Sequence, residues 1–364
     1  MAAAYKPVIW VRSKLVYDLA LLAGIFLYIF LYLQVATAYQ DITNPIDGLI
    51  LRMRAFGSCA FILLSMILCI GPLARLDRRF LPLLYNRRHF GVITFMVAVV
   101  HASYVMSWYF AFSPVDSYVA LLSINTDYGQ VLGFPFEVFG ILALLILAIL
   151  ATTSHDFWLS FLTAPVWKAL HMLLYVAYVF VVLHVALGPL QSDKSALFIV
   201  VVGALVLTVS ALHFWTARRE GKIEAIGLAL KRADGMVIAG RISDIKEERA
   251  IIVPVPDGER VAIFRYGGKL SAILNACQHQ NGPLGEGRII DGCVTCPWHG
   301  YQYDPATGRS PPPFTEKVNT FNLKLEGDTI LLDPTPNPPG TRVEPVIIPS
   351  ESAEPSADLK EARA

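Results

Sequence analysis

Six stretches of this chain are dominated by apolar residues over a length that can cross a lipid bilayer, which takes about 20 helical residues. They run approximately over residues 15–38, 50–74, 90–112, 133–152, 166–188 and 195–215. The fourth stretch is the least distinct, because Pro135 and Glu137 stand near its start. The pattern predicts an all-α bundle of six transmembrane helices over residues 15–217, preceded by a short N-terminal segment, residues 1–14.

The pattern changes after Arg219. Residues 218–235 form a linker of mixed character, in which 221–235 are expected to make a short amphipathic helix on the membrane. From 236 to 333, β-rich runs alternate with turns, which is typical of an all-β domain. Residues 334–364 are rich in Pro, Glu and Ser and are expected to be disordered. The strands are expected over 250–255, 260–266, 271–274, 318–326 and 329–332.

The composition agrees with a membrane protein. Hydrophobic residues make up 55% of the 364 residues and charged residues only 16%, whereas soluble domains are nearer a quarter charged. The net charge of +1 does not indicate a polyanionic partner, and we expect no nucleic acid to bind. Five cysteines are too few and too scattered for a disulfide scaffold. Cys59 and Cys69 stand alone in an apolar stretch, so they are expected in the helical core.

Basic residues set the expected orientation. Six crossings place both termini on one side of the membrane, and the opposite side carries only Arg52, Arg54 and Lys194. By the positive-inside rule the side with the termini is cytoplasmic. We therefore expect a multi-pass protein of the inner (plasma) membrane with a cytoplasmic β domain. The basic residues expected on the cytoplasmic side are Lys6, Arg12, Lys14, Arg75, Arg78, Arg79, Arg87, Arg88, Lys168, Arg218, Arg219 and Lys222.

Four residues of the β region have the spacing of metal ligands. Cys277-Gln278-His279 is followed, after sixteen residues, by Cys296-Pro297-Trp298-His299, a C-x-H…C-x-x-H pattern. Two Cys and two His also occur in zinc sites, but in a Rieske [2Fe–2S] centre two Cys hold one iron and two His hold the other. The glycines in C-x-H-x-x-G and C-P-W-H-G, and the following Y-D-P-A-T-G run at 303–308, favour the iron–sulfur centre.

Through these motifs, residues 236–333 resemble the Rieske ferredoxins. The resemblance implies stacked antiparallel sheets with one [2Fe–2S] cluster at the tip, bound by Cys277, His279, Cys296 and His299. Rieske proteins of quinol-oxidising complexes have two further cysteines joined as a disulfide. The same positions here are Gly282 and Trp298, and Tyr301 stands where that group has Ser. These departures resemble the ferredoxins of aromatic-ring dioxygenases and disfavour quinol oxidation. Cys293 is expected to be a buried structural cysteine rather than an alternative ligand.

Histidines stand inside the apolar stretches. His101 lies in the third stretch, and His171 and His184 lie at opposite ends of the fifth. Ionisable side chains at membrane depth are costly and therefore suggest a function, and histidine is a common axial ligand of heme. Over about residues 50–190 the chain resembles the ferric reductase-like transmembrane domain. This family includes bacterial ferric reductases, NADPH oxidases and the heme subunit of the methionine sulfoxide reductase system. The resemblance rests on residues 56–76, 87–105 and 167–187.

This second resemblance implies one or two b-type hemes. His101 would pair with His184 on the far, non-cytoplasmic side, and His171 would pair with a cytoplasmic-side ligand, for which His89 is the first candidate. Thirteen residues of helix separate the two levels by about 20 Å. His89 lies roughly 120° off the helical face of His101, so the alternative is a basic residue at the membrane interface. His213 is a reserve ligand, and His155 is expected at the interface.

The expected function follows from what accompanies the two domains. Ferric reductases and NADPH oxidases continue with FAD and NADPH domains, but this sequence has no nucleotide loop of the G-x-G-x-x-G kind. We expect the Rieske domain to replace the flavin as the cytoplasmic electron port. The chain would be an oxidoreductase or electron-transfer component without a flavin of its own.

The expected partners are a cytosolic reductase of flavin or ferredoxin type, the lipid membrane, and an acceptor across it: ferric iron, oxygen or a partner reductase. The loop 113–132 is the expected acceptor surface. Two alternatives stay open. One is a non-catalytic redox-sensing or anchoring subunit of a larger complex, and the other is inward delivery of electrons to a cytosolic oxygenase.

Overall fold

A computed structural model gives the protein's fold as two compact units, one of helices up to Ala217 and one from Arg218 onward. The residues it describes are 12–39, 44–84, 86–131, 133–155, 158, 161–162, 164–192, 195–229, 231–255, 260–278, 282–297 and 300–349.

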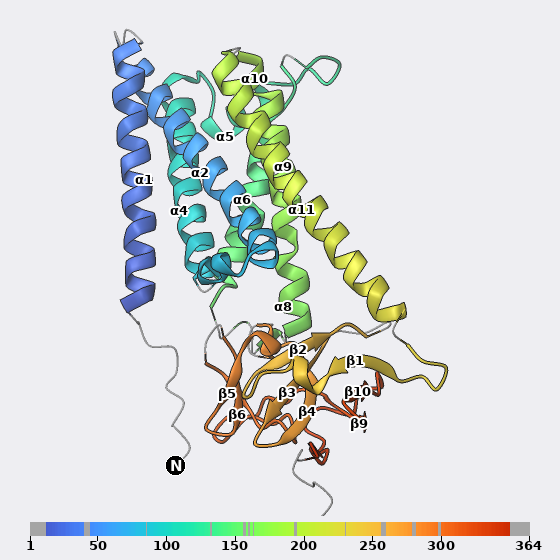
Figure 1. The fold of residues 1–364 in the computed structure, drawn as a ribbon. Helices are drawn as coiled ribbons and strands as arrows, with labels where there is room; N and C mark the ends of the chain where they lie inside the picture. The colour runs from blue at the N-terminus through green and yellow to red at the C-terminus, as the bar shows by residue number, and fades with distance from the viewer. Residues whose placement is uncertain are drawn as a thin grey trace, which may run out of the picture. The chain divides into compact units, whose positions relative to one another are not determined.

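The first unit consists of helices that run back and forth between its two ends (Figure 1). Among the described residues, five helical segments are long and apolar enough to cross a membrane: Leu15–Tyr39, Pro45–Leu76, Arg87–Phe112, Val166–Gln191 and Ala196–Lys222. The fourth predicted stretch forms a shorter helix of 16 residues, so the count of six spans stays a prediction. The helices are α1 (Arg12–Tyr39), α2 (Pro45–Leu76), α3 (Leu81–Leu84), α4 (Arg87–Phe112), α5 (Ser117–Ser123), α6 (Glu137–Thr152), α8 (Ala164–His171), α9 (Leu173–Leu187), α10 (Pro189–Ser192) and α11 (Ala196–Ala229).

Local chemistry explains where the second helix begins. The Asn44 side chain accepts hydrogen bonds from the backbone N–H groups of Ile46 (2.9 Å) and Asp47 (3.0 Å), two of the amides that lack a partner at a helix start. Pro45 occupies the first helical position, where its missing N–H costs nothing. The predicted span 166–188 is divided between α8 and α9, but Met172 between them keeps helical backbone angles (φ −66°, ψ −19°).

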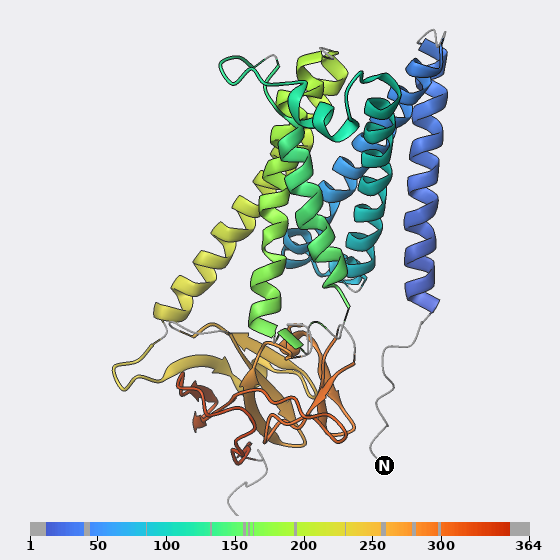
Figure 2. The same cartoon turned by 180° about the vertical axis from the view of Figure 1, so that it is seen from behind.

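The helices pack through a core and expose apolar side chains outward. Phe61 and Leu64 of α2, Tyr178 of α9 and Val202 of α11 belong to one buried cluster. Cys59 is also buried, as predicted. Figures 1 and 2, taken from opposite sides, show α1 at one edge of the helices, beside α2 and α4. Large apolar side chains such as Phe26 (74% exposed) and Phe110 (83%) face outward, which suits helices whose solvent is lipid.

In the residues that the structure describes, the second unit is built from antiparallel strands in three sheets. Their orders are β1-β10-β9, β11-β4-β3-β2 with β8 also pairing β4, and β5-β6-β7. The strands are β1 (Val237–Arg241), β2 (Ala250–Val253), β3 (Val261–Tyr266), β4 (Lys269–Leu274), β5 (Arg288–Ile290), β6 (Cys293–Thr295), β7 (Gln302–Tyr303), β8 (Thr320–Phe321), β9 (Leu323–Glu326), β10 (Thr329–Leu332) and β11 (Val346–Ile347).

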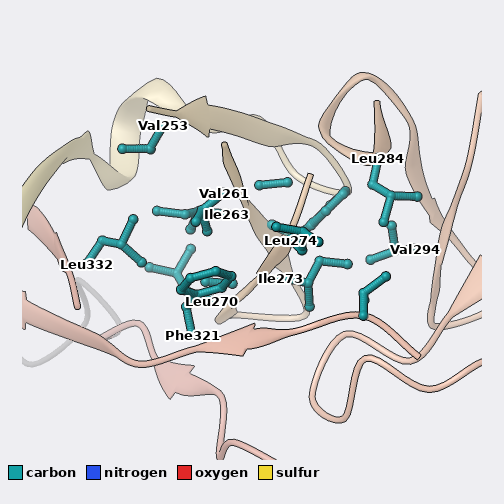
Figure 3. Close-up of a cluster of buried hydrophobic side chains, with 14 of the residues drawn as sticks. Val253, Val261, Ile263, Leu270, Ile273, Leu274, Leu284, Val294, Phe321 and Leu332 are labelled. Carbon is teal, nitrogen blue, oxygen red and sulfur yellow. The ribbon is translucent and has the colours of Figure 1, made fainter. Parts of the chain in front are cut away.

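A tight hairpin fixes the register of the central sheet. β3 and β4 pair from Val261↔Leu274 to Tyr266↔Lys269. Gly267 and Gly268 make the turn with φ values of +53° and +70°, a conformation that glycine adopts without steric cost. Every residue from Val261 to Phe264 is buried, because both faces of β3 are covered. Figure 3 shows the resulting core, in which Ile263, Leu270, Ile273 and Phe321 meet.

The structure differs from two expectations about the ends of this unit. Residues 218–235 were expected to be a linker, with 221–235 a short amphipathic helix on the membrane, but the residues up to Ala229 continue α11. The tail was expected to be disordered from residue 334, but residues 334–349 are ordered. Gly340 N–H donates to Val318 O and Val343 N–H to Ala306 O, and β11 pairs with β4. Main-chain hydrogen bonds, rather than apolar content, thus order this Pro-rich segment. Residues 350–364 lie outside the described residues.

Candidate functional site

The two predicted cluster cysteines lie on neighbouring loops. Cys277 follows β4 and Cys296 follows β6, and their exposed fractions are only 1% and 2%. The first loop is closed by Cys277 N–H donating to Gly282 O (2.9 Å), and the second by Cys296 N–H donating to Tyr301 O (2.8 Å). Neither cysteine is in a disulfide. Two buried cysteines outside any disulfide, on two closed loops, are what a cluster bridging these loops requires.

Tyr303 of β7 joins the two loops through its hydroxyl. Its Oη lies 3.4 Å from Cys277 Sγ and accepts the backbone N–H of Gln278 at 3.0 Å. Since the hydroxyl oxygen accepts this N–H, the hydroxyl hydrogen can be donated to the sulfur. Burial, reinforced by Cys277, raises the pKa of Tyr303, so the hydroxyl keeps its proton. Tyr303 is part of the Y-D-P-A-T-G run noted in the sequence, but its contact with the cysteine was not predicted. The signal in the sequence is a tyrosine four residues after the second predicted histidine ligand, His299.

Tyr301 belongs to the same loop but has a different partner. Its hydroxyl donates to the Glu316 carboxylate, and its ring packs against Tyr303 (5.5 Å between centroids) and Phe314 (5.1 Å). Tyr301 is therefore part of the wall behind the cluster loops and holds the 311–316 segment to them. The predicted histidine ligands His279 and His299 lie outside the described residues.

In the helical unit, the two histidines predicted to pair do meet. The rings of His101 (α4) and His184 (α9) are 6.5 Å apart between centroids and 79° from parallel. His101 Nδ1 lies 2.9 Å from Met53 O, and His184 Nδ1 lies 3.0 Å from Phe136 O. A carbonyl oxygen only accepts, so each Nδ1 carries the proton and each Nε2 keeps its lone pair for a metal.

Two glycines, which sequence analysis missed, lie against these imidazoles. A Cβ on Gly57 of α2 would be 2.9 Å from His101 Cε1, and a Cβ on Gly140 of α6 would be 2.8 Å from His184 Nδ1. Each glycine lies one helical turn after the carbonyl that its histidine contacts. A signal was present in the sequence, because both glycines belong to Phe-Gly pairs and each stands 44 residues before its histidine.

His171 has one nitrogen bound and the other without a partner. Its Nδ1 lies 3.0 Å from Trp167 O, and its ring stacks on the Trp167 indole with 3.7 Å between centroids. Its Nε2 is buried and has no hydrogen-bond partner. An unpartnered buried nitrogen is costly unless a ligand that the structure does not contain completes it. Trp167 is held from the other side, since its indole N–H donates to Thr153 O at 2.8 Å.

The remaining histidines differ in what their ring nitrogens contact. His89 Nδ1 lies 2.8 Å from Asp18 Oδ2 of α1, so an acidic side chain takes the place that carbonyls hold at His101 and His184. His213 has both nitrogens engaged, Nδ1 with Val209 O (2.9 Å) and Nε2 with Tyr175 Oη (3.3 Å), and it is therefore less suited to a reserve role. His155 is exposed.

The spacing of His101 and His184 would allow both imidazoles to hold one iron. Metal–imidazole bonds of about 2 Å on each side, with a ring radius of about 1 Å, give centroids roughly 6 Å apart. The observed 6.5 Å agrees with this. His171, with its unpartnered Nε2, fits a ligand at the other end of the bundle. Heme is the group with an iron of this kind that the ferric reductase resemblance implies.

The predicted acceptor loop is structured by its acidic residues. Asp116 accepts the N–H groups of Tyr118 (3.0 Å) and Val119 (3.3 Å) at the start of α5, and Asp127 accepts the N–H of Gly129 (3.0 Å). Tyr128 is 75% exposed. Asp116 and Asp127 are exposed as well, so the loop presents both acidic and aromatic groups outward.

Comparison with known families agrees with the two-part architecture. The ferric reductase like transmembrane component family matches residues 56–182, and the Rieske [2Fe-2S] domain matches residues 235–322. The two matched ranges fall within the helical unit and the β unit respectively.

Individual relatives match about a fifth of the chain. A Rieske domain-containing protein of Homo sapiens is 42% identical over 82 residues, which are 21% of this chain and 52% of that protein. The ferredoxin subunit of anthranilate 1,2-dioxygenase of Burkholderia cepacia is 38% identical over 66 residues, with 18% and 61% covered. This chain thus spans less than two thirds of either.

A third relative is covered almost completely. The 3-phenylpropionate/cinnamic acid dioxygenase ferredoxin subunit of Escherichia coli (strain K12) is 32% identical over 92 residues, which are 22% of this chain and 87% of that protein. The C-terminal part of the chain therefore belongs to the Rieske [2Fe–2S] family, and a ferric reductase-like transmembrane domain precedes it.

Proposed function

We propose that this protein carries single electrons across a membrane, between a Rieske [2Fe–2S] cluster in its C-terminal domain and a b-type heme held by His101 and His184. The observation that carries the proposal is the pair of facing imidazoles, 6.5 Å apart and each with its Nδ1 on a main-chain oxygen. Heme and cluster both supply one-electron redox chemistry. The chain's own contribution is to hold the ligands and to keep water and lipid away from them.

A second heme site is proposed at the opposite end of the helices. The unpartnered Nε2 of His171 supports a ligand there, and His89 is its proposed partner. The Nδ1 of His89 contacts Asp18, and such carboxylate–histidine pairs commonly orient metal ligands. Two sites about 20 Å apart along the helices would divide the crossing into shorter transfers.

The arrangement in the membrane is part of the proposal. We count α6, a helix of 16 residues, as a span, which brings the number of spans to six. Its Gly140 lies against His184 of α9. With six spans, the basic residues put both termini and the Rieske domain on the cytoplasmic side of the inner (plasma) membrane. The His101–His184 site then lies nearer the far side, and His171 nearer the cytoplasm.

The partners are proposed from the order of these sites. A cytosolic reductase of flavin or ferredoxin type would reduce the cluster through the His279 and His299 edge. The acceptor across the membrane would be ferric iron, oxygen or a partner reductase. The ferredoxin subunits among the relatives favour inward delivery to an oxygenase as the second candidate, because these relatives are subunits of dioxygenases.

Proteoliposomes loaded with ferricyanide test the proposal. Dithionite added outside reduces exposed clusters, and loss of the internal ferricyanide absorbance reports electrons that have crossed. The wild-type protein should bleach ferricyanide, whereas His184→Ala and Cys296→Ser should not. Cluster reduction without bleaching by the wild type would instead favour the sensing or anchoring role.

A further inference from the structure

We infer that Gly57 and Gly140 are a matched pair of positioning residues that set where the two heme-binding imidazoles sit. The inference rests on the proposed heme at His101 and His184 and deepens it, because it assigns the geometry of that site to two residues without side chains. Neither glycine carries a group that could bind iron, so the role is one of placement.

The contacts show how close the fit is. A Cβ at Gly57 would lie 2.9 Å from both Nδ1 and Cε1 of His101, and a Cβ at Gly140 would lie 2.8 Å from Nδ1 of His184. Carbon atoms in contact ordinarily stay about 3.5–4.0 Å apart, so an alanine at either position would displace the ring. Small residues allow helices to approach closely in membranes. Here an imidazole occupies the space that a side chain at the glycine would fill.

The hydrogen bond that orients each ring lies beside the same glycine. Met53 O and Phe136 O lie one turn before Gly57 and Gly140, and each is 48 residues before the histidine it contacts. A carbonyl oxygen has two lone pairs, so it can accept both the helical N–H and the imidazole Nδ1–H. Moving the ring outward would stretch this second bond and shift Nε2 from its place.

The arrangement occurs twice at a fixed interval. Met53, Gly57 and His101 are followed, 83 residues later in each case, by Phe136, Gly140 and His184. Two helix pairs, α2 with α4 and α6 with α9, thus present the same carbonyl–glycine–imidazole unit to a shared centre. Other helical glycines are not confined in this way: a Cβ at Gly24, Gly71, Gly91 or Gly203 would meet nothing within 4 Å.

The experiment compares glycine-to-alanine changes at confined and open positions in the full-length detergent-purified protein. Gly57→Ala and Gly140→Ala are the tests, and Gly91→Ala in α4 and Gly203→Ala in α11 are the controls. The readouts are the rate of heme transfer to excess apomyoglobin and the low-spin electron-paramagnetic signal of the bis-histidine iron. Each test variant should lose heme about 10- to 100-fold faster than wild type, the range typical for residues that orient metal ligands, and its signal should shift.

The sign of the effect separates placement from general destabilisation. Alanine ordinarily stabilises a helix relative to glycine, so the controls should retain heme like wild type, and the test variants should keep wild-type helicity and elution. Wild-type heme retention and signal in both Gly57→Ala and Gly140→Ala would overturn the inference. If His184→Ala also retained the heme, the proposed site itself would be wrong; if only His184→Ala lost it, the site would stand and the glycines would have no part in it.

Discussion

The imidazoles of His101 and His184 come from helices far apart in the sequence and lie 6.5 Å apart between centroids, with their ring planes 79° from parallel. With each Nδ1 bound to a carbonyl, the two Nε2 atoms are the free basic nitrogens of the pair. Replacing either histidine with alanine should therefore remove the heme held by this pair and leave the second heme and the Rieske signal intact. Pyridine hemochrome spectra and electron-paramagnetic resonance measure both. His213→Ala is the control, since its Nε2 contacts Tyr175. An unchanged heme content in His184→Ala would refute the pairing.

The unpartnered Nε2 of His171 leads to a prediction about stoichiometry. We expect two hemes per cluster in the wild type and one in His171→Ala, because the second iron would lose a ligand. His89→Ala should have the same effect, and Asp18→Asn a smaller one that raises the potential of that heme, since a neutral amide makes imidazole a weaker donor. Heme extraction and acid-labile sulfide give the ratio. Two hemes in His89→Ala would show that His171 has a different partner.

The Tyr303 hydroxyl should tune the cluster. A hydrogen bond to Cys277 Sγ stabilises the more electron-rich, reduced state, so Tyr303→Phe should lower the midpoint potential. One hydrogen bond of about 1 kcal/mol corresponds to roughly 40 mV for one electron. Tyr301→Phe is the matched control, because that hydroxyl donates to Glu316 instead. Equal shifts in the two variants would mean that the contact with the sulfur is not the cause.

Two cysteines three residues apart should behave differently. Cys296 is 2% exposed on the cluster loop, and Cys296→Ser should abolish the Rieske signal. Cys293 lies in β6, where burial, with Asp304 and Asp291, raises the pKa of its thiol. Cys293→Ala should therefore retain the signal. A raised pKa also leaves less thiolate at pH 8, so iodoacetamide should label Cys293 more slowly in the native than in the unfolded protein, as mass spectrometry can determine. Loss of the signal in Cys293→Ala would make it a ligand or a loop support.

The ordered tail should stabilise the Rieske domain. Truncation after Asp333 removes four main-chain bonds donated by Asn337, Gly340, Val343 and Ile348, at about 1 kcal/mol each, together with the β11 edge of the sheet. We expect the free energy of unfolding to fall by roughly 3–4 kcal/mol, followed as loss of the cluster's visible circular dichroism on heating. Truncation after Pro349 is the control. Equal melting of both truncated forms would contradict the prediction.

The sequence predicted the features that depend on periodicity or fixed spacing. Apolar runs of about 20 residues located the long helices, and the Gly267-Gly268 pair located the β3–β4 hairpin. It did not predict that residues 334–349 are ordered, because those residues are held by main-chain partners far away in the chain, as with Val343 and Ala306. Gly57 was missed for a related reason: its role is visible only once His101 of another helix is placed against it. Local sequence patterns indicate which secondary structure a residue favours, whereas the roles of these residues depend on their neighbours in the folded protein.

The matched units around His101 and His184 have a consequence for directionality. A centre assembled from two equivalent halves presents the same chemistry to an electron arriving from either side, so it does not act as a rectifier. Any preferred direction of flow must come from the parts that occur once: α1 with Asp18, the 113–135 connection, and the Rieske domain after α11. Reversing the flow of electrons would then require changes in these unpaired parts, such as a different midpoint potential of the Rieske cluster, and none at the paired histidines.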